Sequence, residues 1–124
     1  MAVLPIVIWP DERLSQVCDA VTEGEDLRDL VQDMLDTMYA APGRGLAGPQ
    51  VGVMKRIFVM DVAWKDGEPD PLVCINPHIT ARSDSVQTMD EGCLSIPGIL
   101  IPVPRPESVT LEWRDPEGRA RRAD

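Results

Sequence analysis

The clearest pattern in the chain is an amphipathic stretch that predicts one long helix at residues 23–41. Apolar side chains recur there at steps of three and four residues, and polar side chains take the opposite face. The apolar positions are Leu27, Leu30, Val31, Met34, Leu35 and Met38. A Thr22-x-x-Glu25 capping box predicts where the helix begins, and Pro42-Gly43 predicts where it ends. Six large apolar side chains need a matching apolar layer, which the visible strands alone are not certain to supply.

After this helix the pattern changes to short β-branched and apolar segments, which predicts a sheet. The expected strands are residues 56–62, 72–75, 79–88 and 108–114. In the last of these, apolar and polar side chains alternate, and Asp115-Pro116-Glu117-Gly118 then predicts a turn into a polar return strand at 119–124. The proline-rich segment 97–106 is expected to be an extended loop along a sheet edge. Near the N-terminus, Pro10 and the residues after it predict one helical turn in an anchored segment.

Length and composition fit a single α+β domain over residues 1–124. The chain is 44% hydrophobic and 27% charged, which excludes the disordered, collagen-like and membrane classes. Its net charge of −9 argues against direct binding to nucleic acid or to an anionic lipid surface. The N-terminal segment lacks the layout of a signal peptide, and the cysteines, Cys18, Cys74 and Cys93, are widely and irregularly spaced. We therefore expect reduced thiols and a cytoplasmic protein.

Two glycine-containing segments carry candidate chemistry. The first, residues 43–52, lacks the sequence of a phosphate-binding or dinucleotide-binding loop. Its glycines let the backbone approach another group closely, and Gln50 brings an amide that can donate to a carbonyl or oxyanion. A tight loop after a helix explains this segment equally well. The second is Glu91-Gly92-Cys93-Leu94-Ser95, in which composition alone favours a buried, structural role for Cys93.

Together, and in this order, the two segments resemble the signature segments of the peptide deformylase family, Gly-x-Gly-Leu-Ala-Ala-x-Gln and Glu-Gly-Cys-Leu-Ser. The similarity runs from about residue 3 to the end of the chain, and it includes the segments Ile75-Asn76-Pro77 and Val103-Pro104-Arg105. The resemblance implies a peptide deformylase-like α+β fold. It also implies metal-dependent removal of the formyl group from the N-terminal methionine of new polypeptides, with one Fe²⁺ or Zn²⁺ ion and with N-formyl-Met peptides as partners.

The resemblance also assigns roles to individual residues. Cys93 matches the thiolate ligand of the metal. Gln50 and the backbone N–H of Leu94 match the donors that stabilise the oxyanion. The positions that hold the peptide backbone in an extended pose match Arg44, Gly45 and Gly92.

Three residues of the first segment depart from the family pattern. Gly48 stands where the family has alanine, and Pro49 removes one backbone donor beside Gln50. Arg44 stands where an apolar residue is common. This cation either alters the preference for peptides or is simply solvated, and solvation is the interpretation that we favour at this point.

The family's other two metal ligands are histidines of a His-Glu-x-x-His helix, whose glutamate serves as general acid/base. The chain does not contain this motif, and nothing marks its one histidine, His78, as a displaced ligand. A substitute zinc site from Cys74, His78 and Cys93 has enough donors, but the sequence gives no assurance that they converge. We therefore expect that iron or zinc is not tightly bound.

Three functional hypotheses follow from this pattern. The first is a fragment or truncated form of a deformylase, which cannot perform the reaction as it stands. The second is a non-catalytic binder of formyl-Met or extended peptides. The third is that a partner chain or a second copy covers an incomplete apolar core. The absent motif favours the first.

Overall fold

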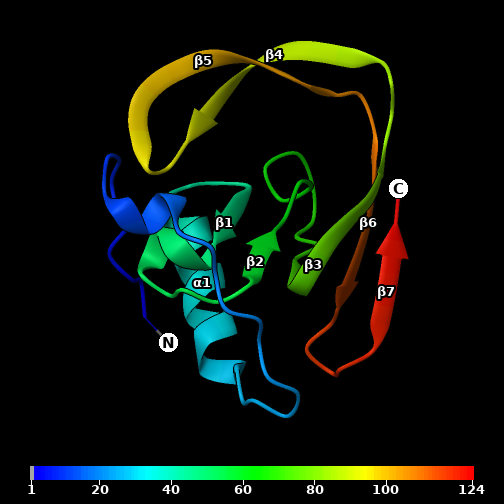
Figure 1. Ribbon diagram of the computed structural model, residues 1–124. Coiled ribbons are helices and arrows are strands. Elements are labelled where there is room, and N and C mark those ends of the chain that lie inside the picture. The colour runs from blue at the N-terminus through cyan, green and yellow to red at the C-terminus, as the bar shows by residue number, and fades with distance from the viewer. Residues whose placement is uncertain (1) are drawn as a thin grey trace.

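The computed structural model describes residues 2–124 and shows one long helix packed on a sheet (Figure 1). The helix, α1 (Arg28–Ala40), lies against a five-stranded antiparallel sheet with the order β1-β2-β3-β6-β7. The strands of this sheet are β1 (Gly45–Ala47), β2 (Ile57–Met60), β3 (Leu72–Arg82), β6 (Val109–Arg114) and β7 (Ala120–Ala123). A separate antiparallel ribbon pairs β4 (Val86–Cys93) with β5 (Ile96–Pro106). The α+β prediction is confirmed.

The core lies between α1 and the first strands of the sheet. Met34 and Met38 of the helix are completely buried, and they pack with strand residues Leu46, Ile57 and Val59. The other apolar residues of the helix are partly buried against this cluster. The strands therefore supply the apolar layer that the helix requires, which the sequence alone left open.

The predicted start of the helix is wrong. The helix begins at Arg28 rather than at 23, and its N-cap residue, Leu27, makes no side-chain capping bond. Thr22 and Glu25 do contact each other, but they close a separate turn in which Gly24 has a φ of 82°. This left-handed residue interrupts a right-handed helix, so the capping-box pattern marks the turn that precedes α1.

The two segments expected as strands at 72–75 and 79–88 belong to one longer strand and the start of the next. β3 runs without a break from Leu72 to Arg82, and its first half pairs with β2 and its second half with β6. The register shifts at Asn76, which has a φ of 50°. The Asn76 side chain accepts a bond from the N–H of Val21 and donates one to its carbonyl, so it ties the segment before the helix to the sheet.

The segment at 97–106 is a strand, and the predicted loop is wrong. β5 pairs with β4 at Ile96 and again over residues 101–106, with Thr88 opposite Pro104 and Asp90 opposite Pro102. The prolines at 102, 104 and 106 are two residues apart, and alternate residues of a strand direct their N–H groups to the same side. The donors missing at these three prolines therefore fall on one edge of residues 101–106, which leaves the other edge able to pair.

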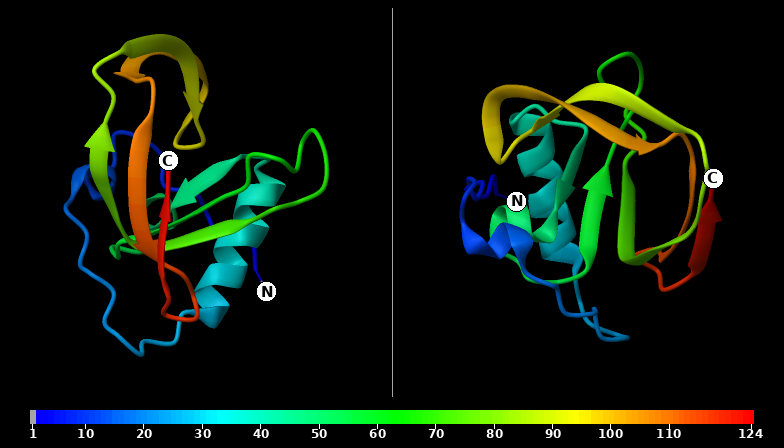
Figure 2. Two further views of the ribbon diagram at one scale, coloured as in Figure 1. Left: turned by 90° about the vertical axis from the view of Figure 1, so that its right-hand side faces the viewer. Right: turned by 45° about the horizontal axis from the view of Figure 1, so that its top comes forward.

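The β4–β5 ribbon arches over the sheet, and its closed end returns to the region of the N-terminal segment (Figure 2). The ribbon has little cover, because its exposed apolar side chains include Val86, Met89, Ile99, Leu100 and Ile101. The sequence indicated a shortage of apolar cover for the helix, whereas the structure has exposed apolar side chains on the ribbon. Self-association through an incomplete core stays a prediction.

The C-terminal hairpin is confirmed. β6 pairs with β7, and Trp113 is buried on the apolar face of β6. The turn between them is closed by the carboxylate of Asp115, which accepts bonds from the N–H groups of Glu117 and Arg119. Within residues 2–124, no helix is both long enough and apolar enough to cross a membrane.

The packing of α1 makes a direct prediction for stability. Met34→Ala is expected to lower the free energy of unfolding by about 2 to 5 kcal/mol, because it removes a fully buried side chain and leaves a cavity. The matched control is Met89→Ala, whose side chain is 59% exposed and whose loss is expected to change stability by less than about 0.5 kcal/mol. Urea unfolding followed by circular dichroism measures both, and equal effects would contradict the assigned core.

Candidate functional site

A cleft of about 1010 Å³ gathers every residue that the resemblance assigned to the site. It lies between the segment that follows α1 and the turn that joins β4 to β5. Its lining includes Arg44, Gly45, Gln50, Gly92, Cys93 and Leu94, which are up to 50 residues apart in the chain. Cys93 is exposed in the cleft, which overturns the buried role that composition alone favoured.

The side chain of Gln50 connects the two sides of this cleft. Gln50 lies in the short 3-10 helix η2 (Gly48–Val51), directly after β1. Its Oε1 accepts a bond of 2.9 Å from the N–H of Ala47, which fixes the orientation of the amide. Its Nε2 then points to the ribbon, 3.2 Å from the Ser95 hydroxyl oxygen and 3.6 Å from the Cys93 sulfur. The amide donor is therefore oriented beside the thiol.

The free edge of β1 faces the same cleft. Among residues 2–124, β1 is the outermost strand of the sheet and pairs only with β2. The Arg44 carbonyl accepts a bond from the N–H of Asp61, so the backbone of Arg44 faces β2. Backbone groups alternate in direction along an antiparallel strand, and those of Gly45 and Ala47 therefore face the free edge. The N–H of Ala47 donates to the side chain of Gln50. The next backbone N–H and C=O groups that face outward along this edge are those of Gly45.

The N-terminal segment holds the two walls of the cleft together. The N–H of Val7 donates to the carbonyl of Gln50 at 2.7 Å, and the N–H of Trp9 donates to the carbonyl of Ser95 at 2.9 Å. The turn predicted after Pro10 is the 3-10 helix η1 (Glu12–Ser15), with Asp11 as its N-cap. The expectation of an anchored N-terminal segment is confirmed. Its two backbone bonds connect the Gln50 side of the cleft to the Ser95 side.

Two glycines allow the close approaches that shape the cleft. A Cβ added at Gly43 would lie 2.8 Å from Cδ1 of Leu94, so Gly43 lets the ribbon turn pack against the end of α1. A Cβ added at Gly48 would lie 2.7 Å from the carbonyl oxygen of Val53. Because that neighbour is backbone rather than a flexible side chain, the loop closes more tightly here than an alanine would permit.

An ion pair stiffens the ribbon next to Cys93. Arg105 of β5 donates two bonds to the carboxylate of Glu91 on β4, at 2.5 and 2.7 Å. The hydrogen bonds from the Arg105 guanidinium hold the pKa of Glu91 below its usual value. The carboxylate of Glu91 therefore holds β4 to β5, and Glu91 is not among the residues that line the cleft.

Sequence reasoning missed the loop after β2, which is organised by the buried carboxylate of Asp61. Asp61 accepts bonds from the Tyr39 hydroxyl and from the backbone N–H groups of Ala63, Trp64 and Asp70. Burial alone would raise the pKa of Asp61, but these four donors together lower it. An aspartate at a strand end, followed by a turn, was the available signal, and it did not show that Tyr39 would be the partner.

This loop forms part of the cleft wall. The indole N–H of Trp64 donates to the Gly43 carbonyl at 2.9 Å, and the ammonium group of Lys65 donates to the Pro42 carbonyl at 3.2 Å. The ring of Tyr39 meets the ring of Trp64 edge to face. Asp61 and Tyr39 thus set the position of Lys65, which lines the cleft.

Comparison with known proteins agrees with this geometry. The model of the family described as polypeptide deformylase matches residues 3–124. The chain belongs to the polypeptide deformylase family. It is 47% identical over 120 residues to a peptide deformylase of Rhizobium meliloti, covering 96% of this chain and 69% of the relative. It is 45% identical to one of Prochlorococcus marinus, covering 90% of this chain and 56% of the relative.

Solved deformylase structures share the fold. A peptide deformylase of Synechococcus elongatus in complex with actinonin superposes with a TM-score of 0.91 at 40% identity, covering 97% of this chain and 66% of that one. A class I type b peptide deformylase of Acinetobacter baumannii superposes with a TM-score of 0.93 at 29% identity, covering 99% of this chain and 83% of that one. The chain spans 69% of the length of the Rhizobium meliloti relative and 56% of the length of the Prochlorococcus marinus relative.

The described residues do not fit the metal that the deformylase family implies. Residues 2–124 contain no group of three His, Cys, Asp or Glu side chains that could hold a metal ion. The substitute site proposed from the sequence does not form, because Cys74 is buried in the sheet, where burial raises the pKa of its thiol to about 11. His78 is exposed on β3, opposite Glu112. Cys93 is left as a single sulfur donor in the cleft.

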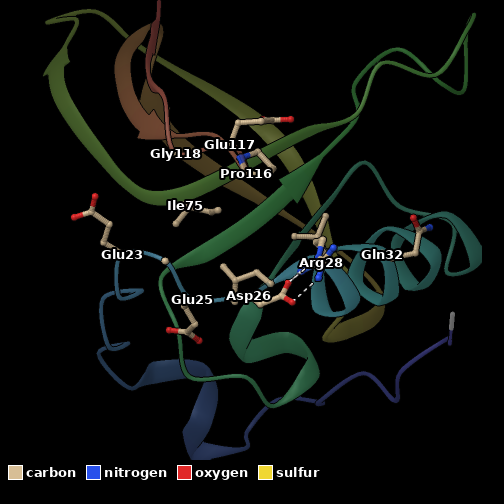
Figure 3. A pocket seen from close by; sticks show the side chains of 12 residues that line it. Glu23, Glu25, Asp26, Arg28, Gln32, Ile75, Pro116, Glu117 and Gly118 are labelled. Atoms are coloured by element: carbon tan, nitrogen blue, oxygen red, sulfur yellow. Dashed lines mark hydrogen bonds and ion pairs between the residues drawn. The ribbon is translucent and has the colours of Figure 1, made fainter.

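A second cavity, of about 730 Å³, lies at the start of α1 beside the β6–β7 turn (Figure 3). It is lined by several carboxylates, but Figure 3 shows Glu23, Glu25 and Glu117 pointing in different directions. Asp26 is paired with Arg28 at 2.9 Å. The acidic groups of this cavity do not converge on a common point, and we assign no function to it.

The tight closure at Gly48 can be tested by substitution. Gly48→Ala is expected to lower the free energy of unfolding by about 1 to 3 kcal/mol, because the new methyl group would overlap the Val53 carbonyl oxygen. The matched control is Gly45→Ala, whose methyl group would lie 3.8 Å from its nearest neighbour and is expected to be tolerated. Thermal unfolding of both variants measures the change in stability. An unchanged stability of Gly48→Ala would contradict the close contact between residue 48 and the Val53 carbonyl oxygen.

The pair of Tyr39 and Asp61 predicts a pH dependence. Because the pKa of Asp61 is lowered on folding, its stabilising effect is present above about pH 4 and is lost as the pH falls further through the folded-state value. Burial and the Asp61 carboxylate raise the pKa of Tyr39 to about 12, so its hydroxyl remains a donor at neutral pH. Tyr39→Phe should therefore destabilise the protein by about 1 to 2 kcal/mol near neutral pH, and by less at a pH low enough to protonate Asp61 in the folded protein.

Urea unfolding of the wild type and of Tyr39→Phe at both pH values measures this difference. The acid lability of all other carboxylates is common to the two proteins and cancels in the comparison. An equal loss of stability at both pH values would contradict a bond between the hydroxyl and a charged Asp61.

Proposed function

We propose that these 124 residues form the formyl-peptide-binding part of a deformylase centre and do not remove the formyl group by themselves. The observation that carries the proposal is the position of Gln50, which lies at the free edge of β1 and donates toward Cys93. Free thiols at Cys18, Cys74 and Cys93 support the cytoplasm as its location.

The free edge of β1 supports recognition of an extended peptide. A peptide laid against this edge would add one strand to the sheet through the N–H and C=O of Gly45. Gly92 lies on the other side of the cleft, where an added Cβ would lie 3.2 Å from Cδ2 of Leu100, so the glycine lets Leu100 pack close to this wall. This mode of binding uses main-chain bonds and so accepts many peptide sequences.

The end of this edge supports recognition of the formyl group. A peptide that runs along β1 toward Ala47 arrives at the Gln50 amide, whose Nε2 can donate to the formyl oxygen. The backbone of Leu94 is a second candidate donor, because it lies in the turn beside Cys93. Apolar side chains at Leu94, Ile96 and Leu100 line the same cleft and offer contacts for methionine.

Hydrolysis requires groups that these residues do not supply. A catalytic zinc site uses three protein ligands, and the cleft offers the Cys93 sulfur alone. We therefore expect that the 124-residue protein retains no stoichiometric iron or zinc after gel filtration and releases no formate from formyl-Met-Ala-Ser amide. Metal analysis and a formate assay measure these outcomes. One tightly held ion per chain together with turnover would contradict the second half of the proposal.

Calorimetric titration with formyl-Met-Ala-Ser amide tests the first half. We expect saturable binding with a dissociation constant between about 0.1 and 1 mM, since the contacts are few and mostly main-chain. Gln50→Glu keeps the acceptor for Ala47 but removes the donor, and it should weaken binding about tenfold or more. The matched control is Gln87→Glu, which makes the same exchange at an exposed position on β4.

Thermal unfolding of each variant shows whether it is folded before it is titrated. No heat of binding for the folded wild type at millimolar peptide would overturn the proposed recognition. Equal weakening by Gln50→Glu and by Gln87→Glu would show that Gln50 makes no direct contact.

A further inference from the structure

The charge of the cleft is opposite to that of the molecule. The chain has 21 acidic and 12 basic side chains, apart from its one histidine, and a net charge of −9. Nevertheless the residues that line the cleft include two cations, Arg44 and Lys65, and no aspartate or glutamate. An acidic protein that keeps carboxylates out of one cleft favours an anionic ligand there.

Both cations adjoin the same short segment of the cleft wall. Lys65 donates to the Pro42 carbonyl at 3.2 Å, and its ammonium has two further N–H groups that can donate to a ligand. Trp64, beside it, is fixed to the carbonyl of Gly43. Arg44 follows Gly43 directly, and its side chain is about half exposed.

Neither cation is neutralised within the cleft. The carboxylate nearest to Arg44 is that of Asp66, at 4.0 Å, which lies at the limit of an ion pair and is 84% exposed. Such an exposed contact contributes little and leaves the guanidinium able to bind another anion. The bond from Lys65 to a neutral carbonyl leaves its full positive charge in place.

We propose that Arg44 and Lys65 make the cleft selective for formyl peptides that carry a carboxylate on a residue after methionine. The inference rests on the proposed function, because it assumes that a formyl peptide occupies the cleft. A formyl group removes the positive charge of the peptide N-terminus. The charge of the peptide near Arg44 and Lys65 is therefore set by groups farther along the peptide. The carboxylate comes from an acidic side chain or from the C-terminus of a short peptide.

Calorimetric titration with a matched series of peptides tests this selectivity. The series is formyl-Met-Ala-Asn amide, formyl-Met-Ala-Asp amide, formyl-Met-Ala-Lys amide and formyl-Met-Ala-Asn with a free C-terminal carboxylate. We expect the two anionic peptides to bind about three to ten times more tightly than the neutral amide, and the lysine peptide to bind more weakly than it. The preference should shrink at about 0.5 M salt because the charges are exposed.

Charge-removing variants locate the source of the preference. In Lys65→Gln and in the double variant Arg44→Gln with Lys65→Gln, the ratio of affinities between the aspartate and asparagine peptides should fall toward one. Arg82→Gln removes one positive charge at the far end of β3 and should leave the ratio unchanged. Comparison of the two anionic peptides shows whether the side chain or the C-terminus provides the carboxylate.

The outcomes separate this inference from the function on which it rests. Equal binding of all four peptides would overturn the selectivity while leaving peptide recognition in place. A preference that Arg82→Gln reduces as much as Lys65→Gln would show that the overall charge of the protein, not the cleft, is responsible. If no peptide binds to the folded protein, the proposed function fails and the selectivity fails with it.

Discussion

The hydrogen bond from the N–H of Ala47 to Oε1 of Gln50 is the interaction on which the site depends. The donor is a backbone N–H at the free edge of β1, and the bond fixes the orientation of the Gln50 side-chain amide. The other end of that amide then reaches Ser95 and Cys93 on the ribbon. The Gln50 amide thus connects β1, η2 and the β4–β5 ribbon. Its N–H donor is oriented toward the cleft without a bound ligand.

The parts of the fold that could be predicted from the sequence are those set by local periodicity. Met34 and Met38 are buried because they share one face of a helix, and Trp113 is buried because it alternates with polar residues on a strand. The errors arose where local patterns have more than one solution. The Thr22 and Glu25 pair forms a turn before the helix, and the prolines of β5 are compatible with pairing on one edge.

The candidate site was predictable in its members but not in its arrangement. Two short motifs identified the cleft residues from Arg44 to Gln50 and from Gly92 to Leu94, yet neither indicates that β1 is an edge strand or that Gln50 lies at its end. The loop held by Asp61 was missed because an aspartate at a strand end did not indicate its partner Tyr39, which lies 22 residues earlier in the chain. The same loop brings Lys65 to the cleft that Arg44 also lines, and the proposed selectivity for anionic peptides rests on these two cations.

Amide hydrogen exchange, followed residue by residue by NMR with and without a saturating formyl-Met peptide, tests the central claim most directly. If a peptide pairs with the free edge of β1, the exchange of the Gly45 N–H should slow on binding. The N–H of Leu46, which faces β2, should change little. Unchanged exchange at Gly45 in the peptide-saturated protein would contradict the account of how this cleft holds its ligand.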